Sequence, residues 1–380
     1  KTKMKFTIIG SCLGKNLVSL KAEHPFYKKQ VPIISAPHVT TDNGTGLVHI
    51  APGHGQDDYV SGIKNNLDVF NPVDDKGKFV KSLEIFGGLS VRDSDQKIID
   101  VLKEKKRLLT QEQYTHSYPH CWRFKTPLIF RATPQWFIGM DNNKLRDKII
   151  DSLPKTKWVP DWGFERIKGM IENRPDWCVS RQRFWGVPMP LFIHKKTDEL
   201  HPKTKEFLDD AASIIEKDGI EGWFDYDKKK LLGSDINLYK EVTDTLDVWF
   251  DSGVTHLCVM QERGLGQVAD LYLEGSDQHR GWFQSSLITA LATIGKPPYK
   301  SVLTHGFVVD SEGQKMSKSL GNIISPQEII QDKGSDILRL WVATTDYSKE
   351  MNISEDIIKQ TTESYRSCLL YTSPSPRDRG

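Results

Sequence analysis

The stretch DLYLEGSDQHRGW, residues 270–282, predicts a strand, a tight turn and the start of a helix. Leu271 and Leu273 belong to the strand, and Gly275 supplies the turn. Gly295 and two prolines stop the helix, which carries four apolar side chains on one face: Phe283, Leu287, Leu291 and Ile294. In doubly wound sheets, ligands bind where parallel strands end. The stretch therefore predicts a parallel α/β layer with a binding edge at Gly275.

Three residues at this strand end suit a nucleotide and an amino group. Gly275 lets the backbone approach a ligand, and Asp277 can hold ribose hydroxyl groups. Glu274, one step earlier, can hold an ammonium group. An N-cap aspartate beside a packing glycine and a surface glutamate would explain the same residues. The stretch alone leaves both interpretations open.

The sequence KMSKS at residues 315–319 lies one strand later, in a loop flanked by glycines. A helix follows, and Ser325–Glu328 opens it with an N-cap serine, a proline and a capping-box glutamate. Lys315 and Lys318 can close on a triphosphate as mobile point charges, and the methionine between them can anchor the loop by packing. A solvated lysine loop is the alternative.

An apolar run with two large rings ends in Asp-Ser-Gly within the segment Asp244–Gly253. This pattern predicts a strand that ends at the edge of a pocket. Trp249 and Trp282 can together wall an apolar side-chain site, since rigid rings define a shape at low entropic cost. Two core tryptophans are the alternative interpretation.

Length and composition limit the class of protein. A chain of 380 residues with 38% hydrophobic residues predicts two to four units with real cores, and no apolar run approaches the ~20 residues of a membrane span. The net charge of +2 gives no overall basic signal for nucleic acid. The five cysteines form no CxxC pair and are odd in number, which favours reduced thiols in a soluble, cytoplasmic protein.

The pattern of residues changes along the chain before the α/β layer begins. Residues 1 to about 115 predict a β-rich module, with strands at Phe6–Ile9, Val31–Ile34 and Gly46–Ile50 and a charged helix near Gln96–Leu109. The aromatic and proline-rich stretch His116–Pro190 predicts irregular connecting structure held by buried rings. Residues 195–240 are charged and helix-turn-like.

Taken together, these segments resemble the isoleucyl-tRNA synthetases of bacterial type, within the class I aminoacyl-tRNA synthetases. The resemblance covers about residues 1–366, and five motifs carry it in the family's order: Asn173–Gly186, Asp247–Gly253, Glu274–Phe283, Thr304–Phe307 and Lys315–Asn322. It implies an α/β fold, the C-terminal half of a Rossmann-like class I catalytic domain, preceded by a β-rich editing module and a connective region. The implied parts are an editing domain at 1–118, a connective region at 119–243, the second Rossmann half with the lysine loop at 244–345, the start of a helical stem at 346–366 and a disordered, non-native tail at 367–380.

The resemblance also implies a reaction and the residues that serve it. Isoleucine reacts with ATP to give isoleucyl-adenylate, and the acyl group then moves to tRNA(Ile). The implied adenylate site consists of Glu274, Gly275, Asp277 and Gln278, with Trp249 and Trp282 around the side chain and His305 as a further candidate that a structural histidine would also explain. The implied ATP-binding residues are Lys315, Ser317 and Lys318, of which the two lysines are the catalytic candidates.

Residues 44–59, GTGLVHIAPGHGQDDY, resemble the editing signature of the same family. A strand is expected to deliver His49 to a glycine-rich turn, where Asp58 opens a helix and can grip an ammonium group while His49 limits side-chain size. Gly44, Thr45 and Gly46 complete the implied editing site. One pocket rejects the smaller valine poorly, as is well known for these enzymes. A glycine-rich turn with an N-cap aspartate is the alternative.

The segment Ser180–Trp185 offers two guanidinium forks and a ring plane, in Arg181, Arg183 and Trp185. These groups suit phosphates and stacked bases at a tRNA end, although buried structural arginine and tryptophan would explain them equally. The expected partners are isoleucine, ATP with Mg²⁺ and tRNA(Ile), bound by a monomer. No zinc site is expected, because Cys121 is followed by Phe124 where some relatives carry a second cysteine.

The sequence also departs from the family. The histidine signature of the first Rossmann half does not occur in it, and residue 1 already lies inside the expected editing module. We therefore expect an internal fragment that does not catalyse isoleucine-dependent ATP–pyrophosphate exchange by itself. A valyl-tRNA synthetase, and a free-standing editing deacylase or tRNA-binding module, are the alternatives.

Overall fold

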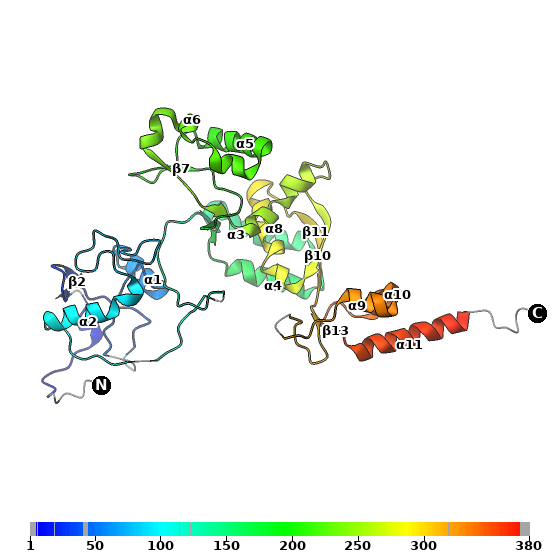
Figure 1. Cartoon of the computed structure of the whole chain (residues 1–380), viewed down its shortest axis with the longest axis horizontal. Helices are drawn as coiled ribbons and strands as arrows, with labels where there is room; N and C mark the ends of the chain where they lie inside the picture. The colour runs from blue at the N-terminus through cyan, green and yellow to red at the C-terminus, as the bar shows by residue number, and fades with distance from the viewer. Residues whose placement is uncertain are drawn as a thin grey trace, which may run out of the picture. The chain divides into compact units, whose positions relative to one another are not determined.

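The structure is a computed structural model that describes residue 5 and residues 7–18, 20–40, 45–113, 115–121, 123–317 and 320–372. The chain forms two compact units, Lys1–Pro134 and Gln135–Gly380 (Figure 1). The expected domain boundaries at residues 118 and 243 stay predictions.

The first unit has little regular structure. Strand β1 (Lys21–Glu23) pairs antiparallel with β2 (Gln30–Pro32), and the two α-helices are α1 (Gln56–Lys64) and α2 (Asp95–Glu104). The described parts of the strands expected at 6–9 and 46–50 have no ladder partner, and Ile9, Leu47 and Val48 are exposed. Because a strand needs a partner for its backbone groups, two of the three expected strands are not formed in the described residues, while β2 overlaps the strand expected at Val31–Ile34. The editing module itself stays a prediction.

The second unit is built on a parallel sheet of three strands. These are β4 (Lys157–Val159), β10 (Ala269–Gly275) and β11 (Tyr299–His305), in the order β10-β11-β4. Helix α8 (Trp282–Thr293) connects β10 to β11, so the predicted strand–helix–strand layer is confirmed. The register places the ends of β10 and β11 side by side, with Gly275 opposite His305.

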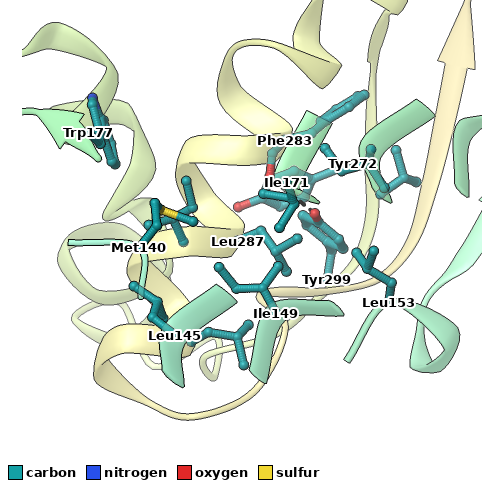
Figure 2. Packing of buried hydrophobic residues seen from close by; sticks show 14 of the residues in the cluster. Met140, Leu145, Ile149, Leu153, Ile171, Trp177, Tyr272, Phe283, Leu287 and Tyr299 are labelled. Atoms are coloured by element: carbon teal, nitrogen blue, oxygen red, sulfur yellow. Dashed lines mark hydrogen bonds between the residues drawn. The ribbon is translucent and has the colours of Figure 1, made fainter. Parts of the chain in front are cut away.

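Three helices make one core with this sheet. Helix α3 (Leu145–Ser152) packs against α8 and α4 (Trp162–Glu172), and α4 also contacts β4. Figure 2 shows Ile149 and Leu287 meeting the aromatic rings of Tyr272, Phe283 and Tyr299. Every residue of α8 from 283 to 291 is buried. The predicted apolar residues Phe283, Leu287 and Leu291 thus lie in the core, but residues 283–291 are buried on every side, and Ile294 follows the helix as a half-buried C-cap.

The expectation of irregular structure throughout His116–Pro190 is wrong. This stretch supplies α3, α4 and β4, together with β3 (Phe137–Ile138), β5 (Trp177–Cys178) and β6 (Ser180–Arg181). Apolar residues four apart explain the two helices, because such pairs lie on one helix face. The buried pairs are Leu145 with Ile149 and Ile167 with Ile171.

Residues 192–241 form a small separate core. Strand β7 (Phe192–His194) pairs antiparallel with β8 (Tyr239–Glu241), and α5 (Thr204–Asp225) and α6 (Lys229–Leu232) lie between them in sequence. Phe192, Phe207 and Trp223 are buried together. The helix-turn character expected for 195–240 is confirmed.

Residues 308–372 are mainly helical, with one pair of short strands. Strand β12 (Val308–Val309) pairs parallel with β13 (Met351–Asn352). The helices are α9 (Pro326–Lys333), α10 (Ser335–Thr344) and α11 (Glu355–Thr372), and their shared core contains Ile329, Ile337, Trp341, Ile353 and Ile358. None of the helices in the described ranges is both long and apolar enough to cross a membrane.

Two expectations about these helices need correction. Residues 367–372 continue α11, although a disordered tail was expected from 367 onward, because no glycine or proline interrupts the helix before Pro374. Residues 373–380 lie outside the described ranges. Ser325 is the N-cap of α9 as predicted, but its hydroxyl donates to Gln327 Oε1 at 3.1 Å, so the capping box is not formed.

Candidate functional site

The ends of β10 and β11 bring together the predicted adenylate-site residues. Glu274 pairs in register with Thr304, and Gly275 with His305. The short 3₁₀ turn Ser276–His279 then presents Asp277 and Gln278, whose side chains approach to 3.5 Å. Glu274 and Asp277 are exposed to solvent. The result is an open polar edge and not a closed pocket.

Gly275 matters at this edge for a reason other than the predicted turn. Its φ of −69° and ψ of 164° are available to any residue. A methyl group on its Cα, however, would lie 2.9 Å from Asp277 Oδ1 and 3.6 Å from His305 Cε1. The glycine therefore allows the Asp277 carboxylate to fold back over the strand end.

The segment before Gly253 is a helix where a strand was predicted. Strand β9 covers only Thr245–Leu246, and α7 (Val248–Gly253) follows it. Asp247 caps this helix, because its Oδ1 accepts a hydrogen bond from the backbone N–H of Trp249 at 3.2 Å. The capping aspartate thus overrides the strand preference of the two large rings.

Helix α7 nevertheless brings the two predicted tryptophans together at the start of α8. The indole Nε1 of Trp282 donates to the Ser252 carbonyl at 3.0 Å, and its ring stacks on Tyr272 at 4.0 Å between centroids. A methyl group on Gly281 would lie 2.8 Å from Trp249 Cη2, so the Trp249 ring covers that glycine. Trp249 stays 45% exposed, so part of this side chain is open to solvent.

The buried carboxylate of Asp247 organises this region. While its Oδ1 caps α7, its Oδ2 accepts hydrogen bonds from Arg181 Nη2 at 2.6 Å and Trp177 Nε1 at 3.0 Å. Burial and the charge of Asp247 together raise the pKa of Asp251. Burial lowers the pKa of Arg174, and the charge of Asp247 opposes that shift. A capping aspartate directly before a helix is the sequence signal that could have identified this residue.

The three residues expected to contact tRNA differ in their surroundings. The guanidinium of Arg181 is engaged by Asp247 and by the carbonyls of Cys178 and Ser180, both at 2.8 Å. Arg183 and Trp185 lie after β6 and are exposed, as is the neighbouring Phe184. The structure therefore supplies an internal role for Arg181 and leaves Arg183 and Trp185 on the surface.

The lysine loop is partly described. Lys315 Nζ lies 4.7 Å from the centroid of the Phe307 ring. Met316 packs against the core of α9–α11, as predicted. Asn322 accepts from the Ser317 backbone N–H at 2.9 Å and donates to Asp310 Oδ2 at 2.7 Å, and this bond lowers the pKa of Asp310. Lys318 lies outside the described residues.

In the first unit, Asp58 lies in the first turn of α1. Its Oδ2 accepts from the Ala51 backbone N–H at 3.2 Å, and its Oδ1 is 4.0 Å from His38 Nε2. Thr45, Gly46 and His49 lie in irregular chain, so the strand expected to carry His49 is absent from the described residues. Gly44 lies outside the described ranges.

No group of three or more His, Cys, Asp or Glu residues in the described ranges is arranged to hold a metal ion. The thiol of Cys121 instead accepts from the Phe124 backbone N–H at 3.5 Å, and the backbone N–H groups of Phe124 and Arg123 lower its pKa. Two hollows of about 670 and 640 Å³ are lined by residues of 138–148 with 291–292 and of 154–165, and neither includes the strand-end residues.

The sequence matches the family model described as tRNA synthetases class I (I, L, M and V) over residues 22–354. The chain belongs to this family. The synthetase chain is 58% identical over 354 residues to the isoleucine–tRNA ligase of Vesicomyosocius okutanii, covering 93% of this chain and 37% of that protein. It is 56% identical over 360 residues to the isoleucine–tRNA ligase of Nitrosococcus oceani, covering 94% and 38%.

The synthetase chain thus spans less than two fifths of the length of these relatives. Among solved structures, methionyl-tRNA synthetase of Mycobacterium tuberculosis bound by methionyl-adenylate matches with a TM-score of 0.40 and 17% identity, covering 66% of this chain and 41% of that one.

Three residues of this synthetase chain were not expected from the sequence as parts of the site. Asp247 joins several elements by hydrogen bonds, and Phe307 and Asn322 contact the lysine loop.

Proposed function

We propose that the chain forms part of an isoleucine–tRNA ligase, which activates isoleucine with ATP and transfers it to tRNA(Ile). The observation that carries this proposal is the strand-end edge, where Glu274, Gly275 and Asp277 lie beside His305. The likeness to isoleucine–tRNA ligases at 58% and 56% identity supports isoleucine as the amino acid.

The first step needs positioning and charge stabilisation more than a covalent catalyst. A carboxylate oxygen of isoleucine forms a bond to the α-phosphorus of ATP. The bond between that phosphorus and the oxygen that bridges the α- and β-phosphates breaks, and pyrophosphate leaves. Asp277 holds the ribose hydroxyl groups and Glu274 the ammonium group of isoleucine. Lys315 and Lys318 neutralise the charge that develops on the departing phosphates.

The remaining partners follow from the same proposal. Trp249 and Trp282 line the isoleucine side chain, and Mg²⁺ accompanies ATP as its counter-ion. The exposed Arg183 and Trp185 contact the phosphates and bases of the tRNA end, supported by their position on the surface. A monomer in the cytoplasm is the proposed working form.

The second proposed activity is hydrolysis of Val-tRNA(Ile) at the first unit. The hydrogen bond from Ala51 N–H holds the Asp58 carboxylate at the start of α1, where it can receive an ammonium group. Asp58→Ala should abolish deacylation of Val-tRNA(Ile), while Asp57→Ala on the same turn should not. Equal loss in both variants would contradict the assignment to Asp58.

A chimera tests the synthetic activity directly. The matching segment of the Nitrosococcus oceani isoleucine–tRNA ligase is replaced by residues 22–354 of this chain, since 56% identity favours a compatible core. Amino-acid-dependent ATP–pyrophosphate exchange is then measured with isoleucine, valine, leucine and methionine.

The proposal expects exchange with isoleucine above the other three amino acids. Faster exchange with valine would favour a valyl-tRNA synthetase. Deacylation of Val-tRNA without any exchange would favour an editing module. Exchange that is absent with all four amino acids contradicts the proposed function.

A further inference from the structure

The lysine loop begins as a short hairpin whose register aims Lys315 at Phe307. Val309 and Lys315 form an antiparallel bridge. The Asp310 carboxylate closes the turn between them by accepting two backbone N–H groups at 2.8 and 3.0 Å. In an antiparallel pair, the residue two positions before the direct partner is a diagonal neighbour on the same face. Phe307 holds that position relative to Lys315.

The contact that results joins a fixed ring to an exposed side chain. Lys315 Nζ lies 4.7 Å from the Phe307 centroid, within the ~6 Å range of a cation–π interaction. The backbone of Phe307 is held on both sides, because its N–H donates to Glu350 Oε2 at 3.2 Å and its carbonyl accepts from Met351 N at 2.8 Å. The ring therefore determines where the ammonium group rests.

The same ring borders the nucleotide edge of the sheet. A methyl group on Gly275 would lie 3.9 Å from Phe307 Cε1 and 3.6 Å from His305 Cε1. Phe307 thus lies between the end of β10, which leads into the turn with Asp277, and the ammonium group of Lys315. An ammonium on this ring stays within the neighbourhood of a bound nucleotide.

The backbone of the loop is held independently of the ring. Asn322 joins the Ser317 N–H to the Asp310 carboxylate, at 2.9 and 2.7 Å. Met316 is anchored in the core of α9–α11. With the backbone fixed at positions 316 and 317, the Lys315 side chain can change partner while these two positions stay in place.

We propose that Phe307 is a positioning residue, whose ring holds the Lys315 ammonium beside the nucleotide edge until a triphosphate draws it away. This inference rests on the proposed function, because it takes ATP as the ligand of the loop. A phosphate oxygen forms a charge-assisted hydrogen bond with an ammonium group, which is stronger than a cation–π contact at an exposed site. The Phe307 ring therefore holds the Lys315 ammonium group in the unliganded chain, and the phosphates of ATP bind that ammonium more strongly than the ring does.

Lysine NMR of the full chain tests the contact. Reductive ¹³C-methylation labels the lysines and keeps their positive charge. The Lys315 signal is the one that disappears in Lys315→Arg. It should lie upfield of exposed lysines because of the ring current, remain upfield in Phe307→Tyr and lose the shift in Phe307→Leu. Lys230, with Nζ 5.6 Å from the Tyr226 centroid, serves as a reference remote from the loop in sequence.

Addition of Mg–ATP to the chimera, in which the Lys315 signal is identified in the same way, should move that signal downfield and leave the Lys230 signal in place. An unshifted Lys315 signal in the unliganded chain, or a shifted one that Mg–ATP does not move, would overturn the inference. If Phe307→Leu fails to fold, the wild-type titration and Phe307→Tyr still decide. Failure of the proposed function is observed in a different experiment, as a chimera that shows no amino-acid-dependent ATP–pyrophosphate exchange.

Discussion

Asp247 Oδ2 accepts a hydrogen bond from Arg181 Nη2 at 2.6 Å while Oδ1 of the same carboxylate caps helix α7. The pair thereby ties strand β6 to the helix that carries Trp249. The next turn of that helix holds Ser252, whose carbonyl accepts from Trp282 Nε1. One carboxylate therefore supports the frame on which Trp249 and Trp282 are placed.

Replacing Asp247 by alanine should lower the free energy of unfolding by about 2–3 kcal/mol, because a hydrogen bond to a charged group is lost and the helix loses its cap. Urea denaturation followed by tryptophan fluorescence measures the change. Asp244→Ala is the matched control, since Asp244 is only half-buried and its carboxylate accepts a 3.2 Å bond from Gln182. A control that destabilises the chain as much as Asp247→Ala would show that the hub assignment is wrong.

His279 predicts a pH dependence of stability. Its ring is fully buried between Trp158 and Trp162, and burial lowers its pKa to about 4. The unfolded chain takes up this proton at a pH near 6.5, well before the folded chain does. Stability should therefore fall as the pH is lowered from about 7 to about 5, by about 2 kcal/mol from this group alone.

Denaturation curves of His279→Asn at several pH values measure that contribution. The variant should show a flatter loss of stability over the same window, whatever its absolute stability. His194→Asn, which removes a partly exposed ring on β7, is the comparison. An unchanged slope in His279→Asn would contradict a buried neutral histidine.

The sheet could be predicted because its evidence is local in sequence. Strand β10, helix α8 and strand β11 follow one another, and the apolar face of α8 was visible as Phe283, Leu287 and Leu291. Strand β4 could not be predicted, because it joins the same sheet from more than a hundred residues away and is only three residues long. Its register with β11 depends on the packing of α3 and α4, which no local pattern reports.

Gly281 tests the placement of the isoleucine pocket. A methyl group there would lie 2.8 Å from Trp249 Cη2 and 2.6 Å from Gln278 Oε1, so the Trp249 ring must move. In the chimera, Gly281→Ala should raise the KM for isoleucine about tenfold and change the KM for ATP less than about twofold. The reason is that a displaced Trp249 ring weakens the binding of isoleucine and leaves the binding of ATP largely unchanged.

A second substitution sharpens this prediction. Trp249→Phe shortens the ring and should restore part of the isoleucine affinity in the Gly281→Ala background. Gly169→Ala on α4 is the control, since no atom lies within 4 Å of its added methyl group. Equal changes in the two KM values would mean that the pocket lies elsewhere.

The Asn322 side chain clamps the lysine loop by hydrogen bonds with the Ser317 N–H and the Asp310 carboxylate, and this clamp predicts a local change in dynamics. Asn322→Ala removes the acceptor of the Ser317 N–H and should speed hydrogen exchange at that amide about tenfold, the effect of losing one hydrogen bond worth about 1–1.5 kcal/mol. Exchange measured by mass spectrometry on peptides covering 315–317 reports it. Ser325→Ala, which removes only the bond to Gln327, should leave this segment unchanged, and faster exchange in both would argue against a specific clamp.

The candidate site was predicted in its residue types more than in its geometry. Glu274, Gly275 and Asp277 could be proposed from the sequence because a glycine at a strand end is a local signal, and their roles stay predictions. The hydrogen bond between Asp247 and Arg181 and the ring under Lys315 were missed, since each depends on a partner from another element: Arg181 on β6 and the hairpin register of β12. The Phe307 contact needs the register of Val309 with Lys315, which the pentapeptide alone does not specify.

A crystal structure of the chimera with a non-hydrolysable isoleucyl-adenylate analogue tests the proposed function most directly. We expect ribose hydroxyl groups within about 3 Å of Asp277, the ammonium group beside Glu274 and the isoleucine side chain against Trp249. An analogue bound away from the ends of β10 and β11, or bound there with its ribose out of reach of Asp277, would contradict it.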